Sequence, residues 1–196
     1  MQPQTFVFFG IIGSGKGTQV KLLMDLLKEK KEDECVYVYP GDEYRKLVRS
    51  GSYVGELIKD SMERGYLQPN FLTDSIVSGI LISSLDSEKH LIVDGYPRTL
   101  IQSKNFEDMM AFFKRENVKI IYLKLSDEEA RKRNLLRGRT DDTEEGIKKR
   151  IDEYKNNVVP AMDYFKDKAD YKIYTINGEQ SIEEVHKDII KAINLQ

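Results

Sequence analysis

The sequence predicts one α/β domain built on a five-stranded parallel sheet, and three observations support this fold class. Short apolar runs rich in β-formers alternate with helical patterns along the chain, which is typical of βαβ units with helices on both faces of the sheet. A glycine-rich segment directly follows the first apolar run. The length of 196 residues suits one sizeable core and is too short for two ordinary domains.

Local signals bound each element in turn. Strands are expected at 5–9, 35–39, 90–94, 118–125 and 172–176. Helices are expected at about 17–32, 42–50, 53–64, 70–86, 101–116, 127–137, 143–168 and 181–194. Four helix starts carry the pattern of a capping box, in which Ser, Thr or Asp precedes Glu or Gln by three residues. The pairs are Thr99 with Gln102, Ser126 with Glu129, Asp142 with Glu145, and Ser181 with Glu184.

The loop after the first strand, residues 10–19, reads Gly-Ile-Ile-Gly-Ser-Gly-Lys-Gly-Thr-Gln and is typical of segments that hold the phosphates of a nucleoside triphosphate. Glycines let backbone N–H groups approach an anion closely, and Lys16 adds a positive charge beside the N-terminus of the next helix. The glycines are Gly10, Gly13, Gly15 and Gly17. A plain turn between strand and helix is the alternative, but strand, spacing and Gly-Lys together favour phosphate binding.

One position of this loop departs from the general pattern. The residue after the lysine, usually Ser or Thr for magnesium, is Gly17, and the hydroxyl comes one residue later at Thr18. We therefore expect Mg²⁺ without a direct protein ligand, held by water, substrate phosphates and a carboxylate elsewhere. Asp94 closes an apolar strand and is the candidate for orienting a magnesium-bound water. Asp is also a common turn former before Gly, which is the alternative interpretation.

Arginines form the second group of candidates. Arg98 follows Pro97, which restricts the backbone, and a planar guanidinium suits a second phosphate group. The others are Arg45, Arg133, Arg137, Arg139 and Arg150. Phosphoryl transfer between two nucleotides has to neutralise charge on donor, acceptor and the group in flight, so several arginines on mobile segments fit that reaction.

Composition excludes several other classes. The 31 basic and 33 acidic side chains are interspersed, so we expect neither a nucleic-acid nor a membrane surface. The single cysteine, Cys35, heads an apolar run and is expected to be a packed thiol in a reducing cytoplasm. No Cys/His cluster has the spacing of a zinc site, and no apolar stretch reaches the length of a membrane span. We expect a cytoplasmic monomer that uses no zinc.

Taken together, these motifs resemble those of the adenylate kinases, within the nucleoside monophosphate kinases, over nearly the full length and in order. The matching segments are 10–19, 41–45, 55–65, 94–102, and 138–142 followed by 148–150. The resemblance implies a single domain over 1–196 with an acceptor-binding flap at about 39–68 and a short lid at about 134–142. It also implies Mg²⁺-dependent, reversible transfer of the γ-phosphoryl group of ATP to AMP, which gives two ADP.

The resemblance also assigns roles to residues. For ATP these are Gly13, Ser14, Gly15, Lys16, Gly17, Thr18, Arg133 or Arg137, and Gln180. For AMP they are Pro40, Arg45, Tyr66, Leu67, Gln68, Gly95, Arg98, Gln102, Arg139 and Arg150. Those expected to act in the reaction are Lys16, Asp94, Arg98, Arg133, Arg139 and Arg150.

One departure concerns the acceptor base. The family has a threonine where this chain has Pro40, so a hydroxyl that contacts the base is missing. Relatives that use UMP or CMP also lack it, which makes a UMP/CMP-type kinase the first alternative. Gln102 offers both a donor and an acceptor to an adenine edge and favours AMP. The second alternative is an ATP-binding switch without turnover, which has no need of the second phosphate site at Arg45 and Arg98.

Overall fold

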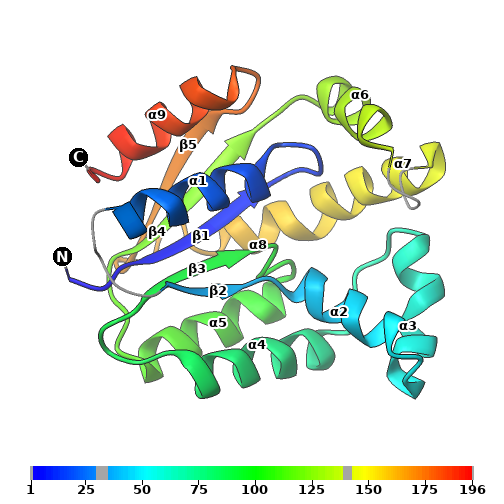
Figure 1. The fold of residues 1–196 in the computed structure, drawn as a ribbon, viewed down its shortest axis with the longest axis horizontal. Helices are drawn as coiled ribbons and strands as arrows, with labels where there is room; N and C mark the ends of the chain where they lie inside the picture. The colour runs from blue at the N-terminus through cyan, green and yellow to red at the C-terminus, as the bar shows by residue number, and fades with distance from the viewer. Residues whose placement is uncertain (1, 30–34, 139–142, 196) are drawn as a thin grey trace.

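The computed structural model describes residues 2–29, 35–138 and 143–195. Its centre is a five-stranded sheet in the order β2-β3-β1-β4-β5, in which all neighbouring strands are parallel (Figure 1). The strands are β1 (Thr5–Gly10), β2 (Cys35–Val38), β3 (His90–Asp94), β4 (Val118–Lys124) and β5 (Tyr171–Asn177). The predicted fold class is therefore confirmed.

Strand alternation builds a separate core on each face of the sheet. Phe6 and Phe8 of β1 point to the face covered by α1 (Lys16–Glu29) and α9 (Ile182–Ala192). Val7 and Phe9 point to the opposite face. That face is covered by α4 (Asn70–Ser84), α5 (Leu100–Phe112) and α8 (Val159–Asp163). Since both faces are covered, β1 and β3 are buried at every position rather than at every second one. The edge strand β5 differs, because Lys172, Thr175 and Asn177 are exposed.

Two helical pairs lie beyond the carboxyl ends of the strands, at the right of Figure 1. The first follows β2 and consists of α2 (Pro40–Arg49) and α3 (Tyr53–Glu63); the second follows β4 and consists of α6 (Asp127–Arg137) and α7 (Glu144–Glu153). Gly55 allows α3 to approach α2 closely, because a β-carbon there would lie 2.1 Å from the Leu47 carbonyl oxygen. Of the expected lid at 134–142, residues 139–142 lie outside the described residues.

The long helix expected at 143–168 is wrong in two respects, because it contains a π-helical turn and ends with α8 at Asp163. After α7 comes a π-helical turn, η1 (Tyr154–Val158), in which the Val159 N–H donates to the Tyr154 carbonyl five residues earlier. Pro160 follows directly and has no N–H with which to continue the α-helical ladder. Helix α2 begins at Pro40, two residues earlier than expected, because proline is well suited to a first helical position.

The capping boxes are confirmed in part. At α9 the box is complete between Ser181 and Glu184. Ser126 and Thr99 cap α6 and α5 with their hydroxyls, but Glu129 and Gln102 do not return the second bond. The predicted Asp142 falls outside the described residues, and the N-cap of α7 is the neighbouring Thr143.

None of the helices in the described part of the chain combines the length and the apolar character that a membrane crossing requires.

Candidate active site

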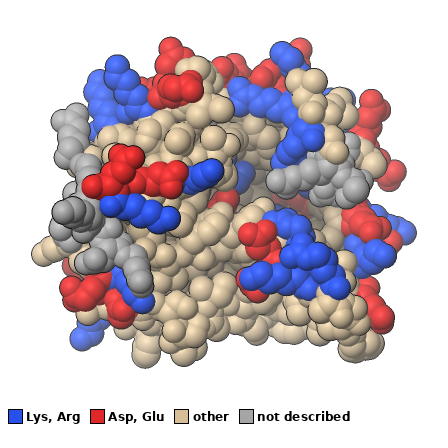
Figure 2. Space-filling model, in the orientation of Figure 1, with Lys and Arg blue, Asp and Glu red and all other residues tan. Residues whose placement is uncertain are grey.

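A cleft of about 720 Å³ opens at the carboxyl ends of the strands, between the loop after β1 and the two helical pairs. In Figure 2, Lys and Arg side chains stand around a hollow on this face. Most of the predicted site residues line the cleft: Gly13, Gly15, Lys16, Gly17, Thr18, Pro40, Arg45, Tyr66, Leu67, Gln68, Asp94, Gly95, Arg98, Gln102, Arg133, Arg137 and Arg150. Ser14 and Gln180 are not among the lining residues, and Arg139 lies outside the described residues.

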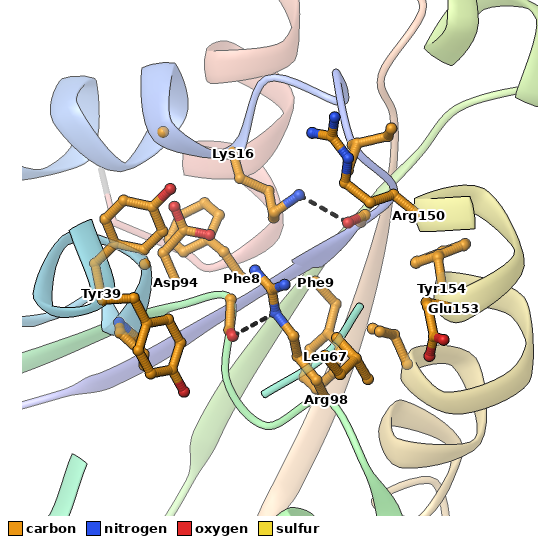
Figure 3. A pocket seen from close by; sticks show the side chains of 18 of the residues that line it. Phe8, Phe9, Lys16, Tyr39, Leu67, Asp94, Arg98, Arg150, Glu153 and Tyr154 are labelled. Carbon is orange, nitrogen blue, oxygen red and sulfur yellow. Dashed lines mark hydrogen bonds between the residues drawn. The ribbon is translucent and has the colours of Figure 1, made fainter. Parts of the chain in front are cut away.

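The loop after β1 folds around its own lysine. Lys16 Nζ donates to the carbonyl oxygen of Gly10 at 2.7 Å (Figure 3). It also donates to the carbonyl oxygen of Ile11 at 3.1 Å. Ser14 is buried and its Oγ lies 3.4 Å from the same ammonium, so its side chain supports the lysine from behind the cleft. Gly13 has φ +76°, and a β-carbon there would lie 2.6 Å from Asn134 Nδ2 of α6. Glycine is therefore required for the loop to pack against α6.

Burial lowers the pKa of Lys16 from 10.5 to about 8. The nearby Asp94 carboxylate acts in the opposite direction, while Arg98 and Arg137 lower the pKa further. The charged form of the lysine is thus disfavoured by both its surroundings and its cationic neighbours. An anion placed among these three cations would relieve that penalty.

Asp94 lies at the end of β3 on the floor of the cleft (Figure 3). Burial raises the pKa of its carboxyl, and the charges of Lys16 and Arg98 oppose that shift. Its Oδ1 is buried and has no hydrogen-bond partner. A buried carboxylate oxygen without a partner is costly unless a bound group satisfies it, and a water on a hydrated cation would do so. Among the described residues no group of three or more Asp, Glu, His or Cys side chains is arranged to hold a metal ion.

Arg98 is held at one edge of its guanidinium. Its Nε donates to the Gly95 carbonyl at 2.7 Å, and its backbone N–H donates to Gln102 Oε1 at 2.8 Å. Gly95 has φ +72°, and a β-carbon there would lie 2.7 Å from Arg98 Nη2. In Figure 3, Arg98 and Lys16 extend toward the same space from opposite sides of the cleft. The arginine is therefore aimed by its own loop.

The two helical pairs contribute further cations to the cleft. Arg45 of α2 is paired with Asp42 and lies over the Tyr39 ring, 5.2 Å from its centroid. Arg150 of α7 donates from Nε to the Gly146 carbonyl at 3.2 Å. Gly65, which follows α3, packs against this arginine, since a β-carbon at that position would lie 2.9 Å from Arg150 Cγ.

Helix α6 holds its two arginines differently. Arg133 donates from Nε to Glu129 Oε1 at 2.7 Å and from Nη1 to the Gly178 carbonyl at 2.9 Å. Gly178 belongs to the loop that carries Gln180, whose side chain turns away to Asp188. Arg137, one turn further along α6, is close enough to Lys16 to lower the pKa of that lysine.

Sequence reasoning missed several side chains that line the cleft: Tyr37, Tyr39, Tyr44, Met62, Thr73, Glu153 and Tyr154. Tyr37 lies close enough to Asp94 for each group to shift the pKa of the other. Tyr44 lies one helical turn after Pro40, a spacing that places both on one face of a helix and was a usable signal. Thr73 had no such signal, because its helix is apolar on much of its surface. Burial raises the pKa of Tyr44, so its hydroxyl stays protonated at neutral pH.

A glycine-rich loop that carries Lys16, together with arginines that line the same cleft at the carboxyl ends of a parallel sheet, is the arrangement of a P-loop phosphotransferase. Comparison with known proteins agrees with this class. The adenylate kinase family model matches residues 8–170. Similar proteins include the adenylate kinases of Rickettsia africae (strain ESF-5) and Rickettsia conorii (strain ATCC VR-613 / Malish 7), at 33% and 32% identity. Each alignment covers 96% of this chain and 98% of the relative. The chain belongs to the adenylate kinase family.

The lowered pKa of Lys16 leads to a prediction about proton uptake. In the free protein at pH 8, about half of the Lys16 side chains are neutral. A bound triphosphate favours the charged form and raises the pKa, so ATP binding should take up about 0.5 proton at pH 8 and almost none at pH 6.5. Calorimetric titrations with Mg-ATP in buffers of different ionisation enthalpy measure this number. Equal proton uptake at the two pH values would contradict the assignment, and Lys16→Met is the control that removes the titrating group.

Proposed function

We propose that this protein catalyses the reversible, Mg²⁺-dependent transfer of the γ-phosphoryl group of ATP to AMP, giving two ADP. The observation that carries the proposal is the pair of cationic groups on opposite sides of one cleft, Lys16 in the phosphate loop and Arg98 on the loop after β3. A protein that only bound ATP would need the first of them. Two facing anion sites are what a reaction between two nucleotides requires.

On the donor side, we assign the backbone of residues 13–18 and the ammonium of Lys16 to the phosphates of ATP. The carbonyls of Gly10 and Ile11 hold Lys16 next to the cleft, where the Asp94 carboxylate is near enough to oppose the lowering of its pKa. Asp94 Oδ1, buried and without a partner, fits a water of hydrated Mg²⁺. When bound with ATP, that ion would neutralise phosphate charge.

On the acceptor side, we assign Arg45, Arg98 and Arg150 to the phosphate of AMP and to the group in transfer, together with Arg139, which lies outside the described residues. A phosphate oxygen of AMP attacks the γ-phosphorus, and the bond from that phosphorus to the oxygen shared with the β-phosphate breaks, so both products are ADP. Negative charge in the transition state spreads over the transferring oxygens, where several guanidinium groups stabilise it. The reaction needs no covalent protein intermediate.

The two arginines of α6 are assigned different tasks. Arg133 is bonded to Gly178 on the loop of Gln180, which supports a place beside the adenosine of ATP. Arg137 lies near enough to Lys16 to lower its pKa, which supports a place beside the transferring phosphoryl group. We further propose that residues 39–68 act as an acceptor-binding flap and residues 134–142 as a short lid in one domain, and that the enzyme is a cytoplasmic monomer.

An acceptor panel tests the proposal directly. Purified protein with Mg²⁺ and ATP is given AMP, UMP, CMP, GMP or dAMP, and formation of diphosphates is followed. We expect AMP to lead UMP, CMP and GMP by about a hundredfold or more, because a pocket that hydrogen bonds its base rejects bases that leave those groups unpaired. The acceptor dAMP carries the same base as AMP and is not subject to this discrimination. A lead of UMP or CMP would identify the UMP/CMP-type alternative. Binding of ATP without phosphorylation of any acceptor would identify a switch protein.

Replacing Arg98 with lysine should lower kcat/KM for AMP by about a hundredfold. A single ammonium cannot reproduce the guanidinium that is held at Gly95 on one edge and presents its other edge to a phosphate. Steady-state rates at saturating ATP measure the effect. Arg131→Lys is the matched control, because Arg131 is exposed on α6. Wild-type rates in Arg98→Lys would refute its assigned role.

Lysine variants of the α6 arginines should separate their tasks. Arg137→Lys should lower kcat by about a hundredfold and change the KM for ATP little, since it acts on charge in the transition state. Arg133→Lys should raise the KM for ATP by about tenfold and affect kcat less. Initial rates over a range of ATP concentrations distinguish the two. The reverse pattern would exchange the assignments.

A further inference from the structure

Two buried hydroxyl groups, one from α2 and one from α4, lie together on the wall of the cleft. Tyr44 of α2 is 8% exposed and Thr73 of α4 is 5% exposed, and both line the cleft. Tyr44 Oη and Thr73 Oγ1 are 2.5 Å apart. The mechanism described above uses neither side chain. Polar groups buried at the edge of a binding site usually have a defined hydrogen-bonding task.

The direction of this hydrogen bond follows from the surroundings of Thr73. Its Oγ1 donates to the carbonyl of Pro69, one turn earlier, at 3.2 Å. A hydroxyl has one hydrogen, so Thr73 has none left for Tyr44, and Tyr44 has to donate to Thr73. The Tyr44 oxygen is then left with lone pairs only. Toward the cleft, Tyr44 is an acceptor.

Gln102, which lines the same cleft as Tyr44, has the opposite hydrogen-bonding character. It is 2% exposed, and its Oε1 accepts from the Arg98 backbone N–H at 2.8 Å. That bond determines which end of the carboxamide faces Arg98 and leaves the Nε2 amino group as the remaining polar end. Toward the cleft, Gln102 is a donor.

Helix α4 ties the acceptor and the donor into one wall. Thr73 holds Tyr44, and the next residue, Asp74, accepts from the Tyr96 hydroxyl at 2.7 Å. That hydroxyl also lies 3.3 Å from the backbone carbonyl oxygen of Gln102. At the start of the helix, Asn70 Oδ1 accepts from Thr99 Oγ1 at 2.9 Å. Tyr44 is thus linked to Thr73, and Gln102 is linked through Tyr96 to Asp74, the next residue of the same helix.

Purine bases differ in how they match an acceptor beside a donor. Adenine presents an amino donor at position 6 next to ring-nitrogen acceptors, whereas hypoxanthine and guanine present an oxygen acceptor at position 6 and a donor at N1. An acceptor from Tyr44 and a donor from Gln102 match the first pattern. With hypoxanthine or guanine, the Tyr44 acceptor would face the oxygen acceptor of the base and the Gln102 donor would face the N1 donor. The buried groups of the protein would then stay unpaired.

We infer that Tyr44, oriented by Thr73, reads the 6-amino group of the acceptor base and selects AMP over IMP and GMP. The inference rests on the proposed function and adds a specificity-determining residue to it. Tyr44 lies one turn from Pro40 on α2, so its hydroxyl replaces the one that is missing at position 40. Thr73 is a positioning residue, because it acts on the base through Tyr44.

The test compares AMP with IMP, which differ only in this edge of the base. Values of kcat and KM are measured for both acceptors in the wild type, Tyr44→Phe, Thr73→Val and Thr73→Ser. We expect Tyr44→Phe to reduce the ratio of kcat/KM for AMP to that for IMP by about tenfold or more, mainly through the KM for AMP. The KM for ATP should not change. Thr73→Val should reduce the ratio as well, and Thr73→Ser should restore it, since serine keeps the hydroxyl.

Tyr174→Phe is the matched control, because Tyr174 lies on β5, outside the flap and not among the residues that line the cleft, and should keep the wild-type ratio. An unchanged ratio in Tyr44→Phe, or an equal loss of kcat with both acceptors, overturns the inference while the proposed function stands. A wild type that prefers UMP or CMP overturns both. Thermal unfolding shows whether each variant is folded, and Thr73→Val decides the question if Tyr44→Phe is not.

Discussion

The structure depends on holding several positive charges together at one end of a sheet before any anion arrives. Lys16, Arg98 and Arg137 are near enough for the two arginines to lower the pKa of the lysine. Like charges at such distances repel and favour an open or disordered cleft. The protein offsets this with backbone carbonyls: Gly10 and Ile11 accept from Lys16, Gly95 from Arg98, Gly146 from Arg150 and Gly178 from Arg133.

Carbonyl oxygens suit this task because they are partial charges. A carboxylate paired with Arg98 would compete with a phosphate, whereas the Gly95 carbonyl at one edge leaves the remaining N–H groups and the net charge available. Arg45 and Arg133 differ from Arg98, because they also pair with the carboxylates of Asp42 and Glu129. Glycines supply many of these carbonyls, and Gly95 also lacks the β-carbon that would block the arginine it holds. The cation site and the glycine content of the loops therefore have one physical cause.

Two side chains that could cap their own helices are used instead to hold arginines of the cleft. Gln102 and Glu129 occupy the third position of their helices, where a capping box would direct them to the N-cap backbone. Gln102 instead orders the backbone of Arg98, and Glu129 holds the guanidinium of Arg133. The N–H of Ser126 is satisfied by Glu179 from the loop after β5. In both cases the side chain that leaves the capping box orders an arginine that lines the cleft, Arg98 or Arg133. Such departures from local rules are expected at functional sites.

The amino-acid sequence alone determined the five parallel strands and the glycine-rich loop after the first, because apolar periodicity and glycine-rich turns are local signals. The resemblance of its motifs to those of the adenylate kinases added many of the other predicted residues that line the cleft. The sequence did not determine the break after Glu153, the second use of Gln102 and Glu129, or the contact between Tyr44 and Thr73. The contact between Tyr44 and Thr73 joins residues that are 29 positions apart in the sequence. The other features depend on competition among several partners for one side chain. Only packing the helices onto the sheet decides such competition, since it sets which partner is within reach.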